Sequence, residues 1–502
     1  IWDNIVNYTW KKSVHSITAT GVFSAQKYQY DRLYGASKDL SFNSLWYNLN
    51  GGAIESLSSN FSQWTMMSYV GRINYGLMDR YLLTASLRYD GSSRLSEGNK
   101  WALFPSAAIA WRITEEDFAK NLDWLSNLKL RFSYGQAGNT NSVSPYASEG
   151  TISGSVYYPF GTSTSVGNLP ANIANPMLTW ERTSEYNVGL DFGFLNQRIS
   201  GNIEYYNRTT NDLLMKRNIP VHLGYSSVTS NVGSVRNSGF ELQLNTANIV
   251  TKNFAWNTTI NLAYNKNEIV SLADEEDLSN YSIHLKGMRG RYSDKRFIGK
   301  PVDTNWTQNT IGVWQLGEEE EAAKYGCVPG NFKIKDYNND GKLTDDDYII
   351  DGKRTPDWTG GMTNMFKIYD FDFSFHMYFQ AGATQYDRFF ENFALEWNSQ
   401  NFNNLRTNYW TPENPSNTMG RPSQMGSRGN IAYERTDFLK VSYITLGYTL
   451  NKRLMSKWGL DNARIYVTVQ NPFILTKFRG LDPEQPDLTN IGDTDGMTMN
   501  AL

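Results

Sequence analysis

The feature that most constrains this sequence is a period of two in its apolar residues. Between Tyr81 and Asp90, the apolar side chains of Leu83 and Leu87 alternate with the polar ones of Thr84 and Arg88. Successive side chains of a β-strand point to opposite faces, so the alternation predicts a strand with one apolar and one wet face. The same pattern recurs at 128–135, 185–192, 240–244, 256–265, 371–380 and 444–450. The sequence therefore predicts an all-β chain of about a dozen long strands.

The segments that connect these strands alternate in length. Short polar turns stand at 76–80 and 194–198, whereas the other connections are long and rich in Gly, Ser, Asn and Thr. These long connections cover 136–181, 207–239, 265–356 and 381–437. Short turns at one end and long loops at the other are typical of an outer-membrane antiparallel β-barrel. Strands of about 9–11 residues also suit a tilted crossing of the bilayer.

Composition agrees with this interpretation and excludes other classes. The chain has no apolar run near the roughly 20 residues of a membrane-spanning helix, and its mean hydropathy is -0.52. Yet it holds Trp 15, Tyr 31 and Phe 25, which suits rings placed at membrane interfaces. A single Cys excludes a disulfide framework. A net charge of -3 gives no basic footprint for nucleic acid.

Alternation alone also fits a soluble sandwich or propeller. Soluble strands usually have about 5–6 residues, and their connections do not alternate in length in this way. We therefore favour the transmembrane barrel, in which the apolar rows face lipid. The charged residues of the other rows then face a wet lumen; they are Arg88, Asp90, Lys129, Arg131 and Glu204. Such a sheet must close on itself in the bilayer, so we expect further strands from sequence outside this chain.

Several stretches in one order resemble the SusC/RagA-type TonB-dependent transporters of Bacteroidetes. They are Gly71–Leu95, Phe104–Ile113, Leu128–Asn139, Thr179–Phe192, Asn231–Leu242, Thr355–Asn364, Tyr409–Pro415, Phe438–Leu450 and Val469–Glu484. The resemblance implies a plugged outer-membrane barrel of about 22 strands. It also implies import of glycans, or in some members peptides, with a SusD-like lipoprotein and energy delivered through TonB. We also expect no enzyme activity and no required cofactor.

The sequence departs from this family pattern at both ends. It contains no recognisable plug or TonB box, and the segment after Glu484 shows no last alternating strand. We therefore expect residues 1–502 to be the C-terminal part of the barrel, without its plug and its last strand or strands. The segments 265–356 and 381–437 are expected to be extracellular loops. The contact with TonB would belong to the N-terminal region that this sequence lacks.

One local motif predicts a metal site. The stretch from Asp336 to Asp347 follows a D-x-N-x-D-G pattern, in which oxygen ligands at alternate positions surround a calcium ion. The expected ligands are side chains of Asp336, Asn338, Asp340 and Asp347 and the carbonyl of Lys342, with Thr344 acting through water. Asp347 stands where a bidentate Glu is usual. The alternative is a solvated acidic turn without metal.

No catalytic constellation is evident. His15, His222, His284 and His376 are scattered, and Cys327 has no neighbouring His. The loop rings Tyr157, Tyr158, Trp306, Trp314, Trp397 and Trp410 suit sugar stacking, but we favour packing within their own loops. The rival function is a secreted all-β protein that binds or degrades glycans.

Overall fold

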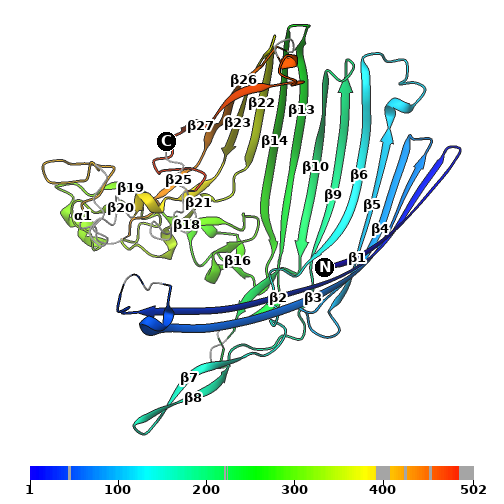
Figure 1. Ribbon diagram of the computed structural model, residues 1–502. Helices are drawn as coiled ribbons and strands as arrows, with labels where there is room; N and C mark the ends of the chain where they lie inside the picture. Colours follow the sequence, from blue (N-terminus) through cyan, green and yellow to red (C-terminus); the bar gives the residue numbers. More distant parts are fainter. Residues whose placement is uncertain are drawn as a thin grey trace. The chain divides into compact units, whose positions relative to one another are not determined.

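A sheet of fourteen strands dominates the structure (Figure 1). The structure is a computed structural model that describes residues 1–42, 44, 47–219, 222, 224–225, 227–391, 407–422, 427–451 and 455–485. The strands of the sheet, in the order in which they pair, are β1 (Trp2–Lys12), β2 (His15–Lys38), β3 (Ala53–Leu77), β4 (Tyr81–Ser92), β5 (Trp101–Arg112), β6 (Leu125–Asn139), β9 (Glu181–Phe194), β10 (Ile199–Asn211), β13 (Ser234–Val250), β14 (Phe254–Ser271), β22 (Trp358–Ile368), β23 (Phe371–Ala381), β26 (Phe438–Thr449) and β27 (Arg464–Thr476). Each long strand pairs with the next one along the chain, which confirms the predicted all-β architecture.

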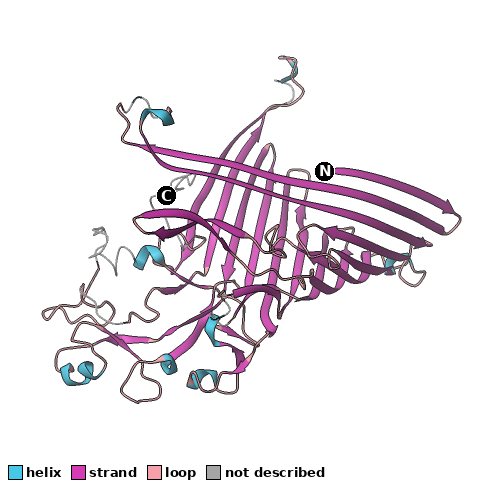
Figure 2. Cartoon of the chain, turned by 90° about the horizontal axis from the view of Figure 1, so that it is seen from below, coloured by secondary structure: helices cyan, strands magenta, loops and turns pink. Residues whose placement is uncertain are grey.

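The connections carry short elements of their own. The short strands are β7 (Ile152–Phe160), β8 (Ser163–Pro170), β11 (Leu214–Asn218), β12 (Ser227–Asn231), β15 (Glu276–Asp277), β16 (Arg289–Arg291), β17 (Arg296–Phe297), β18 (Thr304–Gln308), β19 (Thr310–Val313), β20 (Phe332–Ile334), β21 (Tyr348–Lys353), β24 (Thr384–Tyr386) and β25 (Tyr433–Arg435). The helices are α1 (Glu319–Lys324), α2 (Arg388–Phe390) and the 3-10 turns η2 (Leu49–Gly51), η3 (Ile113–Glu115), η5 (Ile283–Leu285), η6 (Tyr292–Asp294) and η7 (Asp345–Asp347) (Figure 2). No helix in the described part of the chain has the length and apolarity needed to cross a membrane.

Contacts within the chain divide it into two units. The first comprises Ile1–Arg112, Arg131–Tyr186 and Arg208–Ser234, and the second comprises Ile113–Leu130, Asn187–Asn207 and Val235–Leu502. In the first unit a small core gathers where connections meet strand ends; its buried members are Leu95, Ala102, Phe104, Val143, Leu178 and Trp180. In the second unit the buried clusters lie mainly in the long connections, as described below.

The apolar rows of the sheet lie at the surface. In β4, Leu83, Leu87 and Tyr89 are exposed, while Ser86 is half-buried and Asp90 is buried. A soluble sandwich buries its apolar row and exposes the polar one. The reversed arrangement is expected of strands whose apolar face meets lipid and whose polar face lines the lumen.

The long strands extend further than the alternation predicted. β6 continues to Asn139, β10 to Asn211 and β14 to Ser271, so the loops expected from 136, 207 and 265 begin later than predicted. These extensions do not alternate between apolar and polar residues, and the one in β14 includes the adjacent Ile269 and Val270, so pairing continues there without a period-two signal. β23 ends at Ala381 and β26 begins at Phe438, which are the ends of the segment 381–437.

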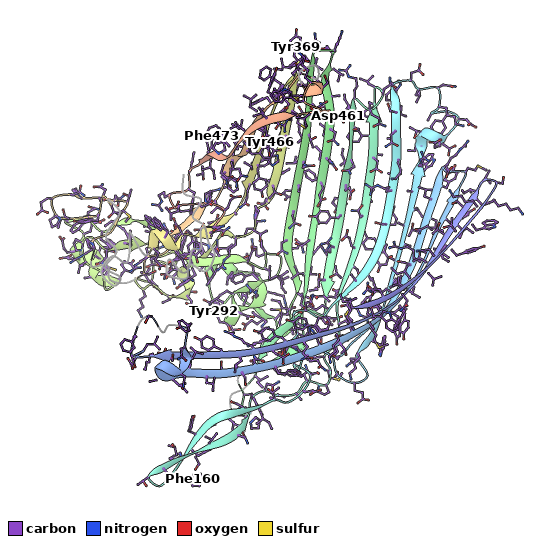
Figure 3. All side chains as sticks on the ribbon, viewed as in Figure 1. Phe160, Tyr292, Tyr369, Asp461, Tyr466 and Phe473 are labelled. Carbon is purple, nitrogen blue, oxygen red and sulfur yellow. The ribbon has the colours of Figure 1, made fainter. Side chains whose placement is uncertain are left out.

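Turns alternate with these long connections. Only residues 369–370 separate β22 from β23, and Figure 3 shows Tyr369 at this turn. The connection between β6 and β9, by contrast, contains the β7–β8 hairpin, with Phe160 close to its end (Figure 3).

Candidate functional site

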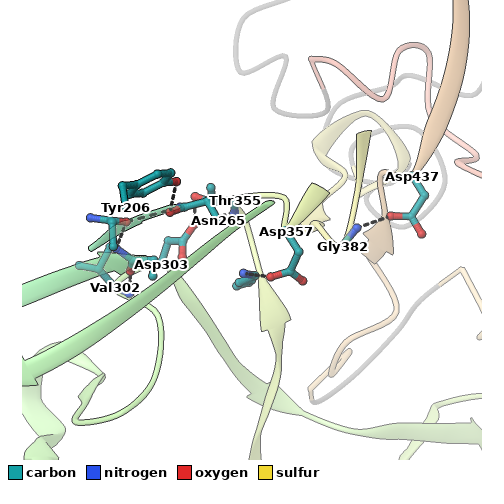
Figure 4. Close-up of polar contacts among 11 residues, drawn as sticks. Tyr206, Asn265, Val302, Asp303, Thr355, Asp357, Gly382 and Asp437 are labelled. Atoms are coloured by element: carbon teal, nitrogen blue, oxygen red, sulfur yellow. Dashed lines mark hydrogen bonds and ion pairs between the residues drawn. The ribbon is translucent and has the colours of Figure 1, made fainter. Parts of the chain in front are cut away.

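Polar contacts anchor the two longest connections, 272–357 and 382–437, at the ends of their strands (Figure 4). The Tyr206 hydroxyl donates to Asn265 Oδ1 at 3.0 Å, and the Asn265 N–H donates to the Asp357 carbonyl at 2.9 Å. The Gly382 N–H donates to Asp437 Oδ1 at 2.7 Å, which ties the first residue of one connection to its last. These bonds fix where each connection leaves the sheet.

Gly382 occupies a position that no other residue fits well. Its φ is +96°, and a Cβ there would lie 2.6 Å from Asp357 Oδ2. Both the left-handed backbone and the close carboxylate require glycine.

The two longest connections share one hydrophobic core. Its buried members from 272–357 are Val313, Phe332 and Ile334, and those from 382–437 are Phe390, Trp410, Met419 and Ala432. The core lies within the second unit and outside the sheet. The two connections therefore fold as one loop domain, which we define as residues 272–357 with the described residues of 382–437.

Side-chain hydrogen bonds also join the two halves of the loop domain. The Val313 N–H donates to Asn417 Oδ1 at 2.9 Å, and the Trp410 Nε1–H donates to Gln315 Oε1 at 3.0 Å. Asn430 Nδ2 donates to Asp351 Oδ2 at 2.8 Å. Buried polar groups are thus paired across the two connections.

The described loop tryptophans pack within the loop domain, and of these Trp410 belongs to the core shared by the two connections. Trp314 and Trp410 are buried, and Trp306 stacks on Tyr348 with ring centroids 5.8 Å apart. Lys333 Nζ also lies 4.1 Å from the centre of the Trp314 ring. These contacts agree with the interpretation that the rings pack their own loops.

Other loop rings are placed differently. Tyr157 and Tyr158 are exposed on the β7–β8 hairpin. Trp397 lies outside the described residues.

The predicted calcium segment is a tight turn organised by Asp336. Asp336 Oδ1 accepts from the Asn339 N–H at 2.6 Å, and Oδ2 accepts from the Gly341 N–H at 2.9 Å. The Tyr325 hydroxyl donates to the same Oδ2 at 3.0 Å. Burial and this bond raise the pKa of Tyr325 to about 12. The conformation needs φ values of +57° at Asn339 and +79° at Gly341.

The other expected ligands are also engaged within the turn. Asp347 is fully buried and accepts from the Tyr337 and Thr344 N–H groups at 2.8 and 2.9 Å. Asp340 Oδ1 accepts from the N–H of Lys342 at 2.8 Å, and Asn338 Nδ2 donates to Asp340 Oδ2 at 3.1 Å.

Within the described ranges, no three His, Cys, Asp or Glu side chains converge in a way that would hold a metal. Calcium binding at this turn therefore stays a prediction.

Charged residues of the polar face pair with neighbours. Arg88 Nε lies 2.6 Å from Asp90 Oδ2, and Lys129 Nζ lies 2.8 Å from Asp191 Oδ2. Asn187 Nδ2 donates to Glu204 Oε2 at 3.2 Å. Polar side chains that the alternation placed on the wet face thus pair with one another through ion pairs and hydrogen bonds.

His376 and Cys327 are both held in place by neighbouring side chains. His376 Nδ1 lies 2.8 Å from Thr363 Oγ1, and its ring stacks on Tyr443. Cys327 is buried beside Trp314, and burial raises the pKa of its thiol.

The sequence analysis did not identify β1, β2 or the part of β3 that precedes Ile73. The row Tyr28, Tyr30, Arg32 and Tyr34 in β2 has the right period for one strand face, and that spacing was the available signal.

The fold and its exposed apolar rows define an outer-membrane β-barrel segment, and comparison with known families names the family. The chain matches the model "TonB dependent receptor-like, beta-barrel" over residues 3–471 and belongs to that family. The predicted fold class, a transmembrane antiparallel β-barrel, is confirmed, and the chain is a bacterial outer-membrane protein.

Individual relatives confirm the resemblance that the sequence motifs indicated. TonB-dependent receptor SusC of Bacteroides thetaiotaomicron is 36% identical, over 84% of this chain and 41% of its own length. TonB-dependent receptor P26 of Formosa agariphila is 32% identical, over 96% of this chain and 50% of its own length. The chain thus spans about half the length of the curated relatives that it matches.

Solved structures show the same fold. The RagAB peptide transporter superposes with a TM-score of 0.79 over 96% of this chain and 52% of that one, at 24% identity.

Proposed function

We propose that this chain forms part of the barrel of a TonB-dependent importer that takes up glycans or peptides across the outer membrane. The observation that carries the proposal is the reversal of the strand faces. Exposed Leu83, Leu87 and Tyr89 alternate with half-buried Ser86 and buried Asp90, as a lipid-facing wall around a polar lumen requires.

The loop domain supports a role in recognition. Loops positioned by a rigid scaffold commonly carry binding functions, and these two connections have a core and hydrogen bonds of their own. A preformed surface loses less conformational entropy when it binds a ligand or a partner protein. We propose that a SusD-like surface lipoprotein binds where the loop domain lies. We also propose that TonB supplies the energy for import through the N-terminal region.

The chemistry supports transport without catalysis. In the described part of the chain, Cys327 is a buried thiol, and His376 contacts Thr363 and Tyr443 within the sheet. Neither is presented to a substrate as a nucleophile or a general base. The proposed protein therefore binds and moves its substrate unchanged.

The proposal is tested with the full-length protein in its native host. We expect it to fractionate with the outer membrane and to leave that membrane only in detergent. Deletion of its gene should abolish uptake of a labelled oligosaccharide or peptide, and a plasmid copy should restore it. Recovery from the soluble periplasm would favour the secreted glycan-binding protein instead. Uptake that survives the deletion would also contradict the proposal.

A further inference from the structure

The segment that follows β27 packs on the loop domain. Residues 477–485 come directly after Thr476, the last residue of β27, and we call them the strap. The Thr476 hydroxyl donates to the Asp437 carbonyl at 2.8 Å and accepts from the Phe478 N–H at 3.0 Å. The Phe478 side chain is buried. The strap therefore begins beside the end of the connection 382–437.

Arg479 joins the strap to two elements of the loop domain. Its backbone N–H donates to Glu434 Oε2 at 3.0 Å, and its side-chain Nε–H donates to Glu434 Oε1. The Nη2 group of the same side chain donates to the Ile431 carbonyl at 3.0 Å. The guanidinium also lies 4.1 Å from the centre of the Phe390 ring. Because Glu434 belongs to β25 and Phe390 to α2, one side chain fastens the strap to both elements.

A fully buried carboxyl group lies beside the strap. Asp387 immediately precedes α2 and has no exposed surface. Its Oδ1 accepts from the Phe390 N–H at 2.9 Å, whereas its Oδ2 is buried and has no hydrogen-bond partner in the described structure. The backbone of Gly480 packs against this second oxygen, since a Cβ built at Gly480 would lie 2.7 Å from it. The strap thus covers the oxygen that lacks a partner.

A negative charge on Asp387 is unfavourable in these surroundings. Burial is the largest cause, and it raises the pKa of the carboxyl above its ordinary value. Two charged groups of the neighbouring elements act with opposite signs, because Glu434 of β25 raises this pKa and Arg479 of the strap lowers it. Hydrogen bonds from the Phe390 and Phe389 N–H groups also lower the pKa, but burial outweighs them.

We propose that the strap is a pH-sensitive latch, closed on the loop domain while the Asp387 carboxyl is neutral and loosened when this carboxyl ionises. A neutral carboxyl lies against the Gly480 backbone without a buried charge. An ionised one needs water around its oxygens, and the closed strap excludes that water. The strap loosens because opening lets the carboxylate become hydrated.

The sign of the pH effect follows from the two states of the strap. In the closed state the pKa of Asp387 is raised, whereas an open strap returns the carboxyl towards its ordinary pKa of about 3.9. Closure is therefore fully favoured below the ordinary value and weakens as the pH rises through the pKa of the closed state. Between the two values the closing equilibrium falls by up to about tenfold for each pH unit.

Hydrogen exchange of the purified full-length protein in detergent tests the latch, from about pH 5 to about pH 8. Rates are corrected for the intrinsic effect of pH on exchange, with β22 as the internal reference. The protection of 476–485 should fall as the pH rises, by up to about tenfold for each pH unit. Asp387→Asn keeps an oxygen for the Phe390 N–H and cannot ionise, so its strap should stay protected throughout.

Two more variants separate the latch from a fixed anchor made by Arg479 alone. Glu434→Gln removes the negative charge that raises the pKa of Asp387, so the total fall in protection should be smaller. Glu413→Gln removes an exposed carboxylate from the same connection and is the matched control. It should keep the pH profile of the unchanged protein.

A fall in protection that Asp387→Asn abolishes supports the latch. Flat protection in the unchanged protein, or a fall that persists in Asp387→Asn, overturns it. The protection of β22 and β23 verifies that each variant is folded. If Asp387→Asn does not fold, Glu434→Gln decides, because a fall equal to that of Glu413→Gln overturns the latch and a smaller one supports it. None of these measurements uses transport, so their result is independent of the proposed function.

Discussion

At the scale of single residues, carboxylates and glycines hold the loop domain in shape. The carboxylates of Asp336 and Asp347 each accept hydrogen bonds from two backbone N–H groups of the turn between them. Gly382 permits a left-handed backbone beside Asp357. The sequence motif identified the Asp336 turn because its spacing is local. It did not identify the bond from Tyr325, because that partner follows α1 and lies outside the motif.

A pH effect follows from the Asp336 turn. Burial raises the pKa of this carboxyl, but hydrogen bonds from Gly341 and Asn339 N–H groups and the Tyr325 hydroxyl outweigh it, so the pKa lies below its usual value. A lowered folded-state pKa gives stability that is complete above the unfolded pKa of about 3.9. That stability is lost as the pH falls through the folded-state pKa. We expect pepsin to cut the 325–347 segment increasingly below about pH 4. Asp336→Asn should remove this dependence; an unchanged pH profile would contradict it.

Calcium binding at the same turn is a separate prediction. Removing the first ligand by Asp336→Ala should abolish the heat of Ca²⁺ binding in calorimetry, because the other oxygens cannot complete the coordination. Glu320→Ala in α1 removes an exposed carboxylate of the loop domain and should leave the heat unchanged. Equal heats for unchanged protein and Asp336→Ala would exclude this site.

At the scale of strands, the two faces of each element have opposite environments. Period two predicted which residues share a face, and the structure agrees along β4. Alternation could not say which face is buried, because a soluble sheet and a membrane sheet have the same pattern. It also could not locate the ends of β6, β10 and β14, since the extensions of these strands do not alternate between apolar and polar residues.

Adjacent positions in β4 provide a matched pair of substitutions. Ala85 lies in the exposed apolar row, between Tyr81 and Tyr89, and Ser86 lies in the polar row. Ala85→Arg should destabilise the folded protein in lipid by about 2–4 kcal/mol, because it places a charge in hydrocarbon. Ser86→Arg should cost clearly less, since its guanidinium points to the wet side. Urea unfolding in liposomes measures both, and equal losses would contradict the assignment of the faces.

At the scale of the whole molecule, the loop domain joins segments that are distant in sequence. Val313 and Asn417 share a hydrogen bond, as do Gln315 and Trp410. No sequence pattern relates these positions, because loop packing has no period. Folding the connections together gives the protein a second structured part besides its sheet.

This joint folding predicts how the loop domain responds to damage. Trp410→Ala should destabilise it by about 3–5 kcal/mol, the usual cost of removing a buried aromatic side chain. Hydrogen exchange should then accelerate in both 304–353 and 407–437, while β22 and β23 stay protected. Trp458→Ala, at an exposed ring, is the control and should leave exchange unchanged. Faster exchange confined to 407–437 would show that the two connections fold separately.

The sequence by itself determined most of the long strands from β4 onward, which residues share a face, the alternation of turns and long connections, and the family. Each of these follows from residue spacing along the chain, where side-chain direction is fixed by local backbone geometry. Only the tertiary structure decided that the apolar rows are exposed and that the two longest connections share a core. The exposure of a face and the packing of the loops depend on which distant segments contact each other. Such long-range contacts do not appear as a periodic pattern in the sequence.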